Sequence, residues 1–420
     1  MKLIRTFGKS AAEATAVIQE IAARGATSTA SVAPAVKKIV TDVKRKGDKA
    51  VREYAEQFDG LQPEQDILVD PAEMEAAWKA LPKHLKAAMK EAAANIHAFA
   101  EAQMPEEWII EPASGVRTGQ VVRPLDAVGC YVPGGRYPLP STLLMTTLPA
   151  QVAGVERIVV CSPKPGQETL AAAHLCGVSE FYRVGGAQAI AMMAYGTDST
   201  PPVTRIVGPG NLYVTAAKQL VSQDCGIDMP AGPTEIVVTS DLGDALGIAT
   251  DLVAQAEHDP ETLAIFITTN EPLAKEVQKQ AKALARKNKL AKQSLEARGT
   301  IFVCETPMEA QALTNLLAPE HLTVDRPEDL QWVRNAGSVF IGPHSPQSMG
   351  DYVSGPNHVL PTGRTGRLRS GLSVMDFVKL ITVQQYTAKG LAKLGPHAIA
   401  MAEAEGLVGH AESVRVRLKP

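Results

Sequence analysis

The chain has 420 residues, of which 45% are hydrophobic and 21% are charged, so it is long enough for about two to three domains with substantial cores. Its formal net charge of −3 gives no sign of a surface that attracts nucleic acid or acidic membranes, and we expect neither as a partner. It lacks an apolar run of the roughly 20 residues needed to span a bilayer, and Met1–Ser10 lack the apolar stretch of a secretory signal.

The first quarter of the chain predicts helices rich in Ala, Lys and Glu, because apolar residues recur there at helical spacing. The helical stretches are Ala12–Ala23, Val36–Phe58 and Met74–Ala102. Around Trp108–Val122 the pattern becomes shorter and favours β-structure. Ala127–Val132 then predicts a strand that ends in a glycine turn.

Strands and helices alternate in two successive blocks after this point. The first block has strands at Arg157–Cys161, Glu180–Val184 and Thr204–Val207, and helices at Glu168–Leu175, Gly186–Tyr195 and Asn211–Val221. The second has strands at Glu235–Thr239, Thr262–Thr268, Thr300–Cys304 and Ser338–Ile341, and helices at Ala245–Glu257, Leu273–Ala291 and Pro307–Leu317. The tail is predicted to be helical through Ile381–Leu394 and His397–Gly406. Two such blocks predict an α/β fold with two parallel sheets flanked by helices.

Glycine-rich turns follow the Ala127–Val132 strand and two strands of the first block, at Gly134-Gly135, Gly185-Gly186 and Gly208-Pro209-Gly210. Glycine at such a turn lets a phosphate approach the backbone and the next helix N-terminus. Each turn by itself is more often simple turn chemistry, and none forms a full GxGxxG with an acidic residue about 20 positions downstream. Together the turns favour a nucleotide, and the flanking residues Tyr131, Gln188 and Asn211 are candidates for its contacts.

A metal site is predicted by three residues with different donor groups. Gln255 and His258 are three positions apart, so on a helix their side chains leave from one face. His258 alone would more often be structural, but Asp351, in an expected loop at Met349–Tyr352, adds a carboxylate. Amide, imidazole and carboxylate donors suit Zn²⁺, Co²⁺ or Mn²⁺ better than a thiolate site does.

Glu320 and His321 place a carboxyl group beside an imidazole, in an expected loop after a helix. A solvated Glu–His pair is the ordinary interpretation when the pair is taken alone. Proton transfer near neutral pH uses these groups, however, and a metal site in the same block favours an enzyme. His358, in a polar loop near Asp351, either shapes the pocket or only holds the loop.

The five cysteines are scattered, and none forms a CxxC pair. They are Cys130, Cys161, Cys176, Cys225 and Cys304. This pattern argues against a disulfide framework and against a cysteine-rich zinc site. We therefore expect a cytoplasmic enzyme with reduced thiols.

Ordered motifs over nearly the whole chain resemble those of the histidinol dehydrogenase family. They are Gly129-Cys-Tyr-Val-Pro-Gly-Gly-Arg136, Gly185-Gly-Ala-Gln188, Gly208-Pro-Gly-Asn211, Asp228-Met-Pro-Ala-Gly-Pro-Thr-Glu235, Gln255-Ala-Glu-His258, Pro319-Glu-His321, Gly350-Asp351, Gly355-Pro-Asn-His-Val-Leu-Pro361 and Glu405-Gly-Leu-Val-Gly-His410. So many motifs in one order make the resemblance highly specific.

The resemblance implies two Rossmann-like parallel-sheet domains with small helical terminal segments, in a domain-swapped homodimer. Residues 31–125 and 235–380 would form the first domain, with the metal and catalytic residues. Residues 126–234 would form the second domain, with the NAD contacts. Residues 1–30 would be an N-terminal helical segment, and residues 381–420 a helical tail that reaches the partner subunit.

The family activity implied is oxidation of L-histidinol through L-histidinal to L-histidine with two NAD⁺, the last steps of histidine biosynthesis. By resemblance, Zn²⁺ would be held by Gln255, His258 and Asp351, with His410 from the other chain. Tyr131, Gln188 and Asn211 would bind NAD. The substrate would be lined by Thr234, Gln255, His258, Glu320, His321, Asp351, Glu405 and His410. Of these residues, His321 would be the base and Glu320 would help water add to the aldehyde.

Three departures from commoner family members touch the edge of this pocket. Thr234 stands where many members carry serine, Pro356 where another small residue is frequent, and the Tyr137–Ser141 segment differs. One alternative is therefore a related zinc- and NAD-dependent enzyme that oxidises another primary alcohol, a polyol or a sulfonated diol, to an acid. Glu405 favours a cationic or imidazole-bearing substrate instead. The other alternative, a non-catalytic nucleotide- or metal-binding protein, is disfavoured because every ligand and acid/base position is filled.

Overall fold

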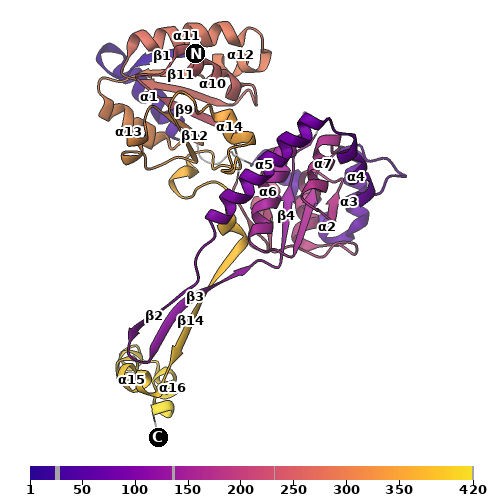
Figure 1. The fold of residues 1–420 in the computed structure, drawn as a ribbon, viewed down its shortest axis with the longest axis vertical. Coiled ribbons are helices and arrows are strands. Elements are labelled where there is room, and N and C mark those ends of the chain that lie inside the picture. The colour runs from indigo at the N-terminus through magenta and orange to yellow at the C-terminus, as the bar shows by residue number, and fades with distance from the viewer. Residues whose placement is uncertain (24–28, 135–137, 231, 419–420) are drawn as a thin grey trace. The chain divides into compact units, whose positions relative to one another are not determined.

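The computed structural model describes residues 1–23, 29–134, 138–230 and 232–418. Gly135, Arg136 and Tyr137, which belong to segments singled out in the sequence, lie outside the described residues, as does Ala231. The chain forms two compact units (Figure 1). One unit comprises Met1–Gln103 and Asp126–Phe377, and the other comprises Met104–Leu125 and Val378–Pro420.

The first unit contains a six-stranded, all-parallel sheet in the order β1-β11-β10-β9-β12-β13. Its strands are β1 (Lys2–Arg5), β9 (Glu235–Thr239), β10 (Leu263–Thr268), β11 (Thr300–Val303), β12 (His321–Val324) and β13 (Ser338–Ile341). Helices α10 (Ala245–Ala256), α11 (Glu271–Ala285) and α12 (Lys289–Ala297) pack into one core, and α1 (Ala11–Ala22) and α13 (Pro307–Leu317) into another. Because helices cover both faces, the inner strands are continuous apolar runs.

A five-stranded, all-parallel sheet in the order β6-β5-β4-β7-β8 lies in the same unit. Its strands are β4 (Ala127–Tyr131), β5 (Arg157–Cys161), β6 (Glu180–Tyr182), β7 (Arg205–Val207) and β8 (Gly226–Ile227). The helices between them are α6 (Pro140–Val152), α7 (Gln167–Leu175), α8 (Gly186–Tyr195) and α9 (Leu212–Val221). The two parallel sheets confirm the α/β fold predicted from the alternation of elements.

The N-terminal helices pack against this five-stranded sheet. They are α2 (Ala33–Lys46), α3 (Asp48–Tyr54), the π-helix η2 (Ala55–Asp59), α4 (Pro71–Ala80) and α5 (Lys83–Ala102). Helix α2 packs on α8 and α9, α4 on α7, and α5 on α6. Val36 and Val40 share one core with Ile190 and Met193. This packing differs from the expected grouping of residues 31–125 with 235–380, because the apolar helix faces are buried on the other sheet.

Two predicted helices differ from the structure. The single helix expected at Leu273–Ala291 is two helices, because the side chain of Asn288 accepts hydrogen bonds from Leu290 N and Ala291 N and so caps α12. Ile381, expected in a helix, lies in the strand β14 (Val378–Tyr386), and α15 (Ala388–Ala404) begins only after Thr387. Likewise, residues 1–30, expected to be helical, begin with the strand β1.

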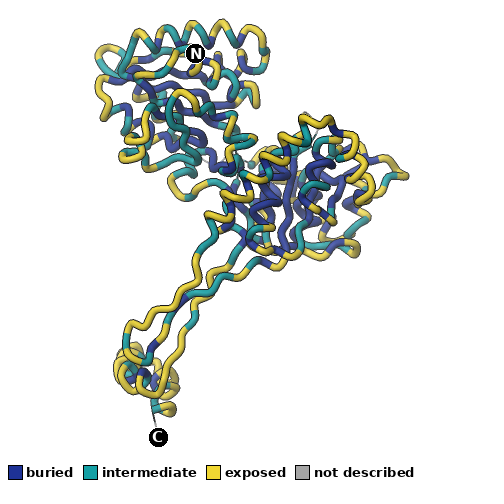
Figure 2. The backbone as a smooth tube through the Cα atoms, in the orientation of Figure 1, coloured by how far each residue is buried: buried dark blue, intermediate teal, exposed yellow. Residues whose placement is uncertain are grey.

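The second unit consists of a three-stranded antiparallel sheet and two helices. The sheet has the order β14-β3-β2, with β2 at Trp108–Ala113 and β3 at Val116–Pro124, and the helices are α15 and α16 (Val408–Leu418). Most of its residues are exposed or only partly buried, in contrast to the buried strands of the two parallel sheets (Figure 2). No helix among the described residues is long and apolar enough to cross a membrane.

Candidate active site

The acid/base pair lies at the amino-terminal edge of the six-stranded sheet. Glu320 follows the left-handed residue Ala318, and His321, expected in a loop, is the first residue of β12. Both side chains are buried. The Oε2 atom of Glu320 accepts hydrogen bonds from the Thr234 hydroxyl at 2.6 Å and the Glu235 amide at 2.8 Å. The start of β9 therefore fixes the carboxylate.

His321 is held in one orientation by the same strand. Its Nδ1 donates to the Glu235 carbonyl at 3.1 Å, which leaves Nε2 at 3.8 Å from the Asp351 carboxylate. Burial lowers the pKa of His321, but the carboxylates of Glu320 and Asp351 raise it, and the result is a pKa of about 10. The surroundings thus stabilise an imidazolium at this position.

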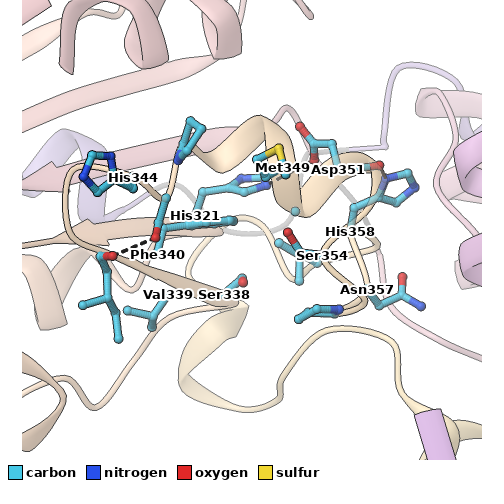
Figure 3. Close-up of a pocket in the computed structure, with 16 residues that line it drawn as sticks. His321, Ser338, Val339, Phe340, His344, Met349, Asp351, Ser354, Asn357 and His358 are labelled. Atoms are coloured by element: carbon cyan, nitrogen blue, oxygen red, sulfur yellow. Dashed lines mark hydrogen bonds and ion pairs between the residues drawn. The ribbon is translucent and has the colours of Figure 1, made fainter. Parts of the chain in front are cut away.

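His321, Asp351 and His358 line one cavity of about 400 Å³ (Figure 3). Asp351, expected in a loop, belongs to the short helix α14 (Gln347–Tyr352). His358 donates from Nδ1 to the Asp351 carbonyl at 2.9 Å and accepts at Nε2 from the Thr142 hydroxyl at 3.2 Å. It therefore both lines the cavity and holds the loop, so the two interpretations left open by the sequence are true together.

The two donors expected on one helix face are placed differently. Gln255 is buried in the last turn of α10, but the helix ends at Ala256 and His258 lies in the exposed bend beyond it. The expectation of a shared helix face is therefore wrong. The reason is local: the Glu257 amide still donates to the Val253 carbonyl four residues back, but the His258 amide donates to the Gln255 carbonyl only three residues back, so the α-helix stops.

Gln255 belongs to a chain of hydrogen bonds that ends at the Glu320 carboxylate. Gln347 Nε2 donates to Gln255 Oε1 at 2.9 Å, Gln255 Nε2 donates to the Thr234 hydroxyl, and that hydroxyl donates to Glu320. Sequence reasoning missed Gln347. The available signal was its position one helical turn before Asp351, which places both side chains on one side of α14.

Within residues 1–23, 29–134, 138–230 and 232–418, no group of three or more His, Cys, Asp or Glu is placed to hold a metal. The expected donors nevertheless fit a divalent cation chemically. Gln255 Oε1 uses one of two lone pairs for Gln347, and His258 lies near enough to Asp351 to be among the causes that lower the pKa of that carboxyl group. The buried Gln347 Oε1 has no hydrogen-bond partner among the described residues. A buried oxygen of this kind needs a partner, and a bound cation or its water would supply one.

Tyr131, Gln188 and Asn211 lie at the carboxyl edge of the five-stranded sheet, where open α/β sheets bind ligands. The Gly186 amide donates to the Tyr131 hydroxyl at 3.2 Å, and the Asn211 side chain caps α9. Gly208 has φ of +112°, and a Cβ there would be 2.1 Å from the Tyr131 carbonyl. Only glycine fits this turn.

Glu405 and His410 belong to the second compact unit. Glu405 follows the last residue of α15, and His410 lies in α16. Both are exposed.

Comparison with known proteins identifies the family. A model described as histidinol dehydrogenase matches residues 22–418. The histidinol dehydrogenase of Methanothermobacter thermautotrophicus is 46% identical over 416 residues, which cover 96% of this chain and 97% of that protein. That of Gluconobacter oxydans is 46% identical over 412 residues, or 95% of each chain. The crystal structure of histidinol dehydrogenase from Elizabethkingia anophelis matches with a TM-score of 0.94 at 36% identity, covering 100% of this chain and 98% of that one. The chain therefore belongs to the histidinol dehydrogenase family.

Proposed function

We propose that this protein oxidises L-histidinol through L-histidinal to L-histidine and reduces two NAD⁺. The observation that carries the proposal is the buried pair of Glu320 and His321, with the His321 Nε2 atom 3.8 Å from Asp351 in one cavity. Two successive oxidations at one carbon need a base and a group that helps water add to the aldehyde. His321 can serve as the base, Glu320 can accept the proton from water, and Asp351 can bind the metal.

Two bound groups complete the proposed site. Gln255, His258 and Asp351 would hold Zn²⁺, with His410 from a second chain, and Tyr131, Gln188 and Asn211 would hold NAD⁺. When bound, Zn²⁺ would orient the imidazole and amino nitrogens of the substrate. When bound, NAD⁺ would accept one hydride in each oxidation.

The side chains would move protons in a fixed order. The pKa of about 10 belongs to a site whose Asp351 carboxylate carries no cation, and a cation bound there would lower the pKa of His321. The neutral ring then takes the hydroxyl proton of histidinol at Nε2 as the hydride leaves carbon, and the Glu320 carboxylate stabilises the imidazolium that forms. Glu320 Oε2 is occupied by Thr234 and Glu235, so Oε1 is the oxygen for a proton from water that adds to the aldehyde. Loss of a second hydride from this hydrate gives the acid.

The reaction predicts two NADH for each L-histidinol consumed. We expect a chelator to abolish this activity and added Zn²⁺ to restore it, because the metal orients the substrate. NADH absorbance and the remaining histidinol give the yield, and circular dichroism checks that the chelated protein stays folded. A yield of one, or faster oxidation of a polyol or sulfonated diol, would contradict the proposed substrate.

We also propose a domain-swapped homodimer in the cytoplasm. The second unit exposes contiguous apolar side chains on β2: Trp108 is 47% exposed, Ile109 53% and Ile110 55%. Leu380 and Ile381 on β14 are also exposed. Exposed apolar surface of this kind marks a protein–protein contact. In a homodimer, a second copy of the chain would bury it and would carry its own Glu405 and His410 to the active site of the first copy. All five cysteines are free and buried, which suits a reducing compartment.

Shared sites predict complementation between inactive chains. A His410→Ala chain and a Glu320→Gln chain should each fail to form L-histidine, because each lacks a group that the other supplies. Heterodimers with one chain of each kind should regain part of this activity, measured as L-histidine formed after refolding a mixture of the two chains. The matched control is a mixture of Glu320→Gln and His321→Ala chains. Both residues lie in the first compact unit, so every site of such a heterodimer keeps one of the two substitutions. Proven heterodimers without activity would exclude a ligand supplied by the partner.

A further inference from the structure

Asp59 reaches the candidate NAD site from a distant part of the chain. It is the last residue of the π-helix η2, which ends at the left-handed Gly60, and single π turns recur at functional positions. Its Oδ2 atom accepts hydrogen bonds from the Gly185 amide at 2.8 Å and from Gln188 Nε2 at 3.0 Å. The side chain is 8% exposed, and burial raises the pKa of its carboxyl group.

This contact determines which end of the Gln188 carboxamide is available. An ionised carboxylate only accepts hydrogen bonds, so it takes the amide nitrogen of Gln188 and leaves the carbonyl oxygen for other partners. That oxygen lies toward the turn, since a Cβ on Gly186 would be 2.8 Å from it. Next to it, the Gly186 amide donates to the Tyr131 hydroxyl, which donates to no residue in the described part of the chain.

We propose that Asp59 is a positioning residue of the dinucleotide site, which orients Gln188 so that its carbonyl oxygen accepts a hydrogen bond from the dinucleotide. The ligand group is a donor, a ribose hydroxyl or an amide N–H. The same carboxylate fixes the Gly185-Gly186 turn through the Gly185 amide. This inference rests on the proposed function, because it takes NAD⁺ as the ligand of Gln188.

Asp48 provides a matched control. It lies in the same N-terminal segment, and its carboxylate also accepts one backbone amide and one side chain, the Ser199 amide at 3.0 Å and the Ser199 hydroxyl at 2.7 Å. It therefore ties the segment to the same sheet without contacting Gln188. Asp59 is the more buried of the two, so we expect alanine there to cost more stability, but a purely structural role predicts no selective loss of NAD⁺ affinity at either position.

The test compares NAD⁺ affinity and steady-state kinetics among Asp59→Ala, Asp59→Asn and Asp48→Ala. We expect Asp59→Ala to raise the KM and Kd for NAD⁺ by about tenfold or more, with the KM for L-histidinol within about twofold of wild type. Asp59→Asn keeps one oxygen acceptor, and a single oxygen of Asp59 accepts both hydrogen bonds, so this variant should bind NAD⁺ like wild type. Asp48→Ala should leave NAD⁺ binding unchanged even if it lowers the melting temperature.

A double-mutant cycle makes the test specific. If Asp59 acts through Gln188, Asp59→Ala should add little to the NAD⁺ defect of Gln188→Ala. Three results would overturn the inference. They are full additivity in this cycle, equal NAD⁺ affinity in Asp59→Ala and Asp48→Ala, and an Asp59→Asn variant that binds NAD⁺ as poorly as Asp59→Ala. Should D59A not fold, Gln188→Met removes the carbonyl and leaves Asp59 in place; a native KM for NAD⁺ then overturns it. If wild type itself forms no NADH, the proposed function has failed instead.

Discussion

Replacing His321 by alanine should lower kcat for L-histidinol by roughly 10²–10⁴-fold, the range of a general acid–base group. The reason is that Nδ1 is fixed by the Glu235 carbonyl, so the same ring presents Nε2 to the cavity. Replacing Glu320 by glutamine should act later, at the addition of water. In a single turnover, the E320Q variant should release about one NADH per site where wild type releases two.

His97 offers the control for His321. It is an exposed histidine on α5, 3.5 Å from Glu101, and His97→Ala should retain native kcat. Because His321→Ala removes the ring whose two nitrogens face the Glu320 and Asp351 carboxylates, thermal unfolding must be measured on each variant. A folded His321→Ala enzyme with unchanged kcat would exclude His321 as the base.

The largest stability effect is expected at the buried ion pair of Lys218 and Asp228. The side chains are 3% and 0% exposed, Asp228 accepts from the Gly208 amide at 2.7 Å, and Lys218 donates to the Gly208 carbonyl at 2.9 Å. Asp228→Ala should lower the free energy of unfolding by about 3–5 kcal/mol, because it leaves a buried ammonium without its partner. Urea denaturation measures the change.

Two further variants separate the ion pair from general packing. The double variant Lys218→Met with Asp228→Asn should recover much of the lost stability, since neither charge remains buried alone. Glu75→Ala breaks an exposed pair with Lys79 and should cost less than about 1 kcal/mol. A loss in Asp228→Ala no larger than that in Glu75→Ala would contradict the importance of the buried pair.

Much of the fold was accessible from the order of residues. The predicted bounds of β5, α8, β9, α13 and β13 agree with the structure. Strands of parallel sheets are buried on both faces, so they are continuous apolar runs between helices and are easy to recognise. The family resemblance is likewise confirmed along the chain.

Elements whose stability depends on distant partners were missed. Strand β14 pairs with β3 along its whole length, although Leu380 and Val122 are far apart in the chain. Its Ile-Thr-Val stretch favours a strand once the partner is present. The helices of residues 33–102 showed their apolar faces in the sequence, but nothing local said which sheet would bury them.

The residues alone determined the element types, the acid/base pair and the candidate ligands, because periodicity and side-chain chemistry are local properties. Tertiary structure decided how these groups act. It placed Glu320 and His321 at the amino-terminal edge of their sheet and linked Gln347 to Glu320 through two intervening side chains. It also brought Asp59 into contact with Gln188. Hydrogen bonds between residues 126 and 129 positions apart have no local signature, since only the packing of the chain creates them.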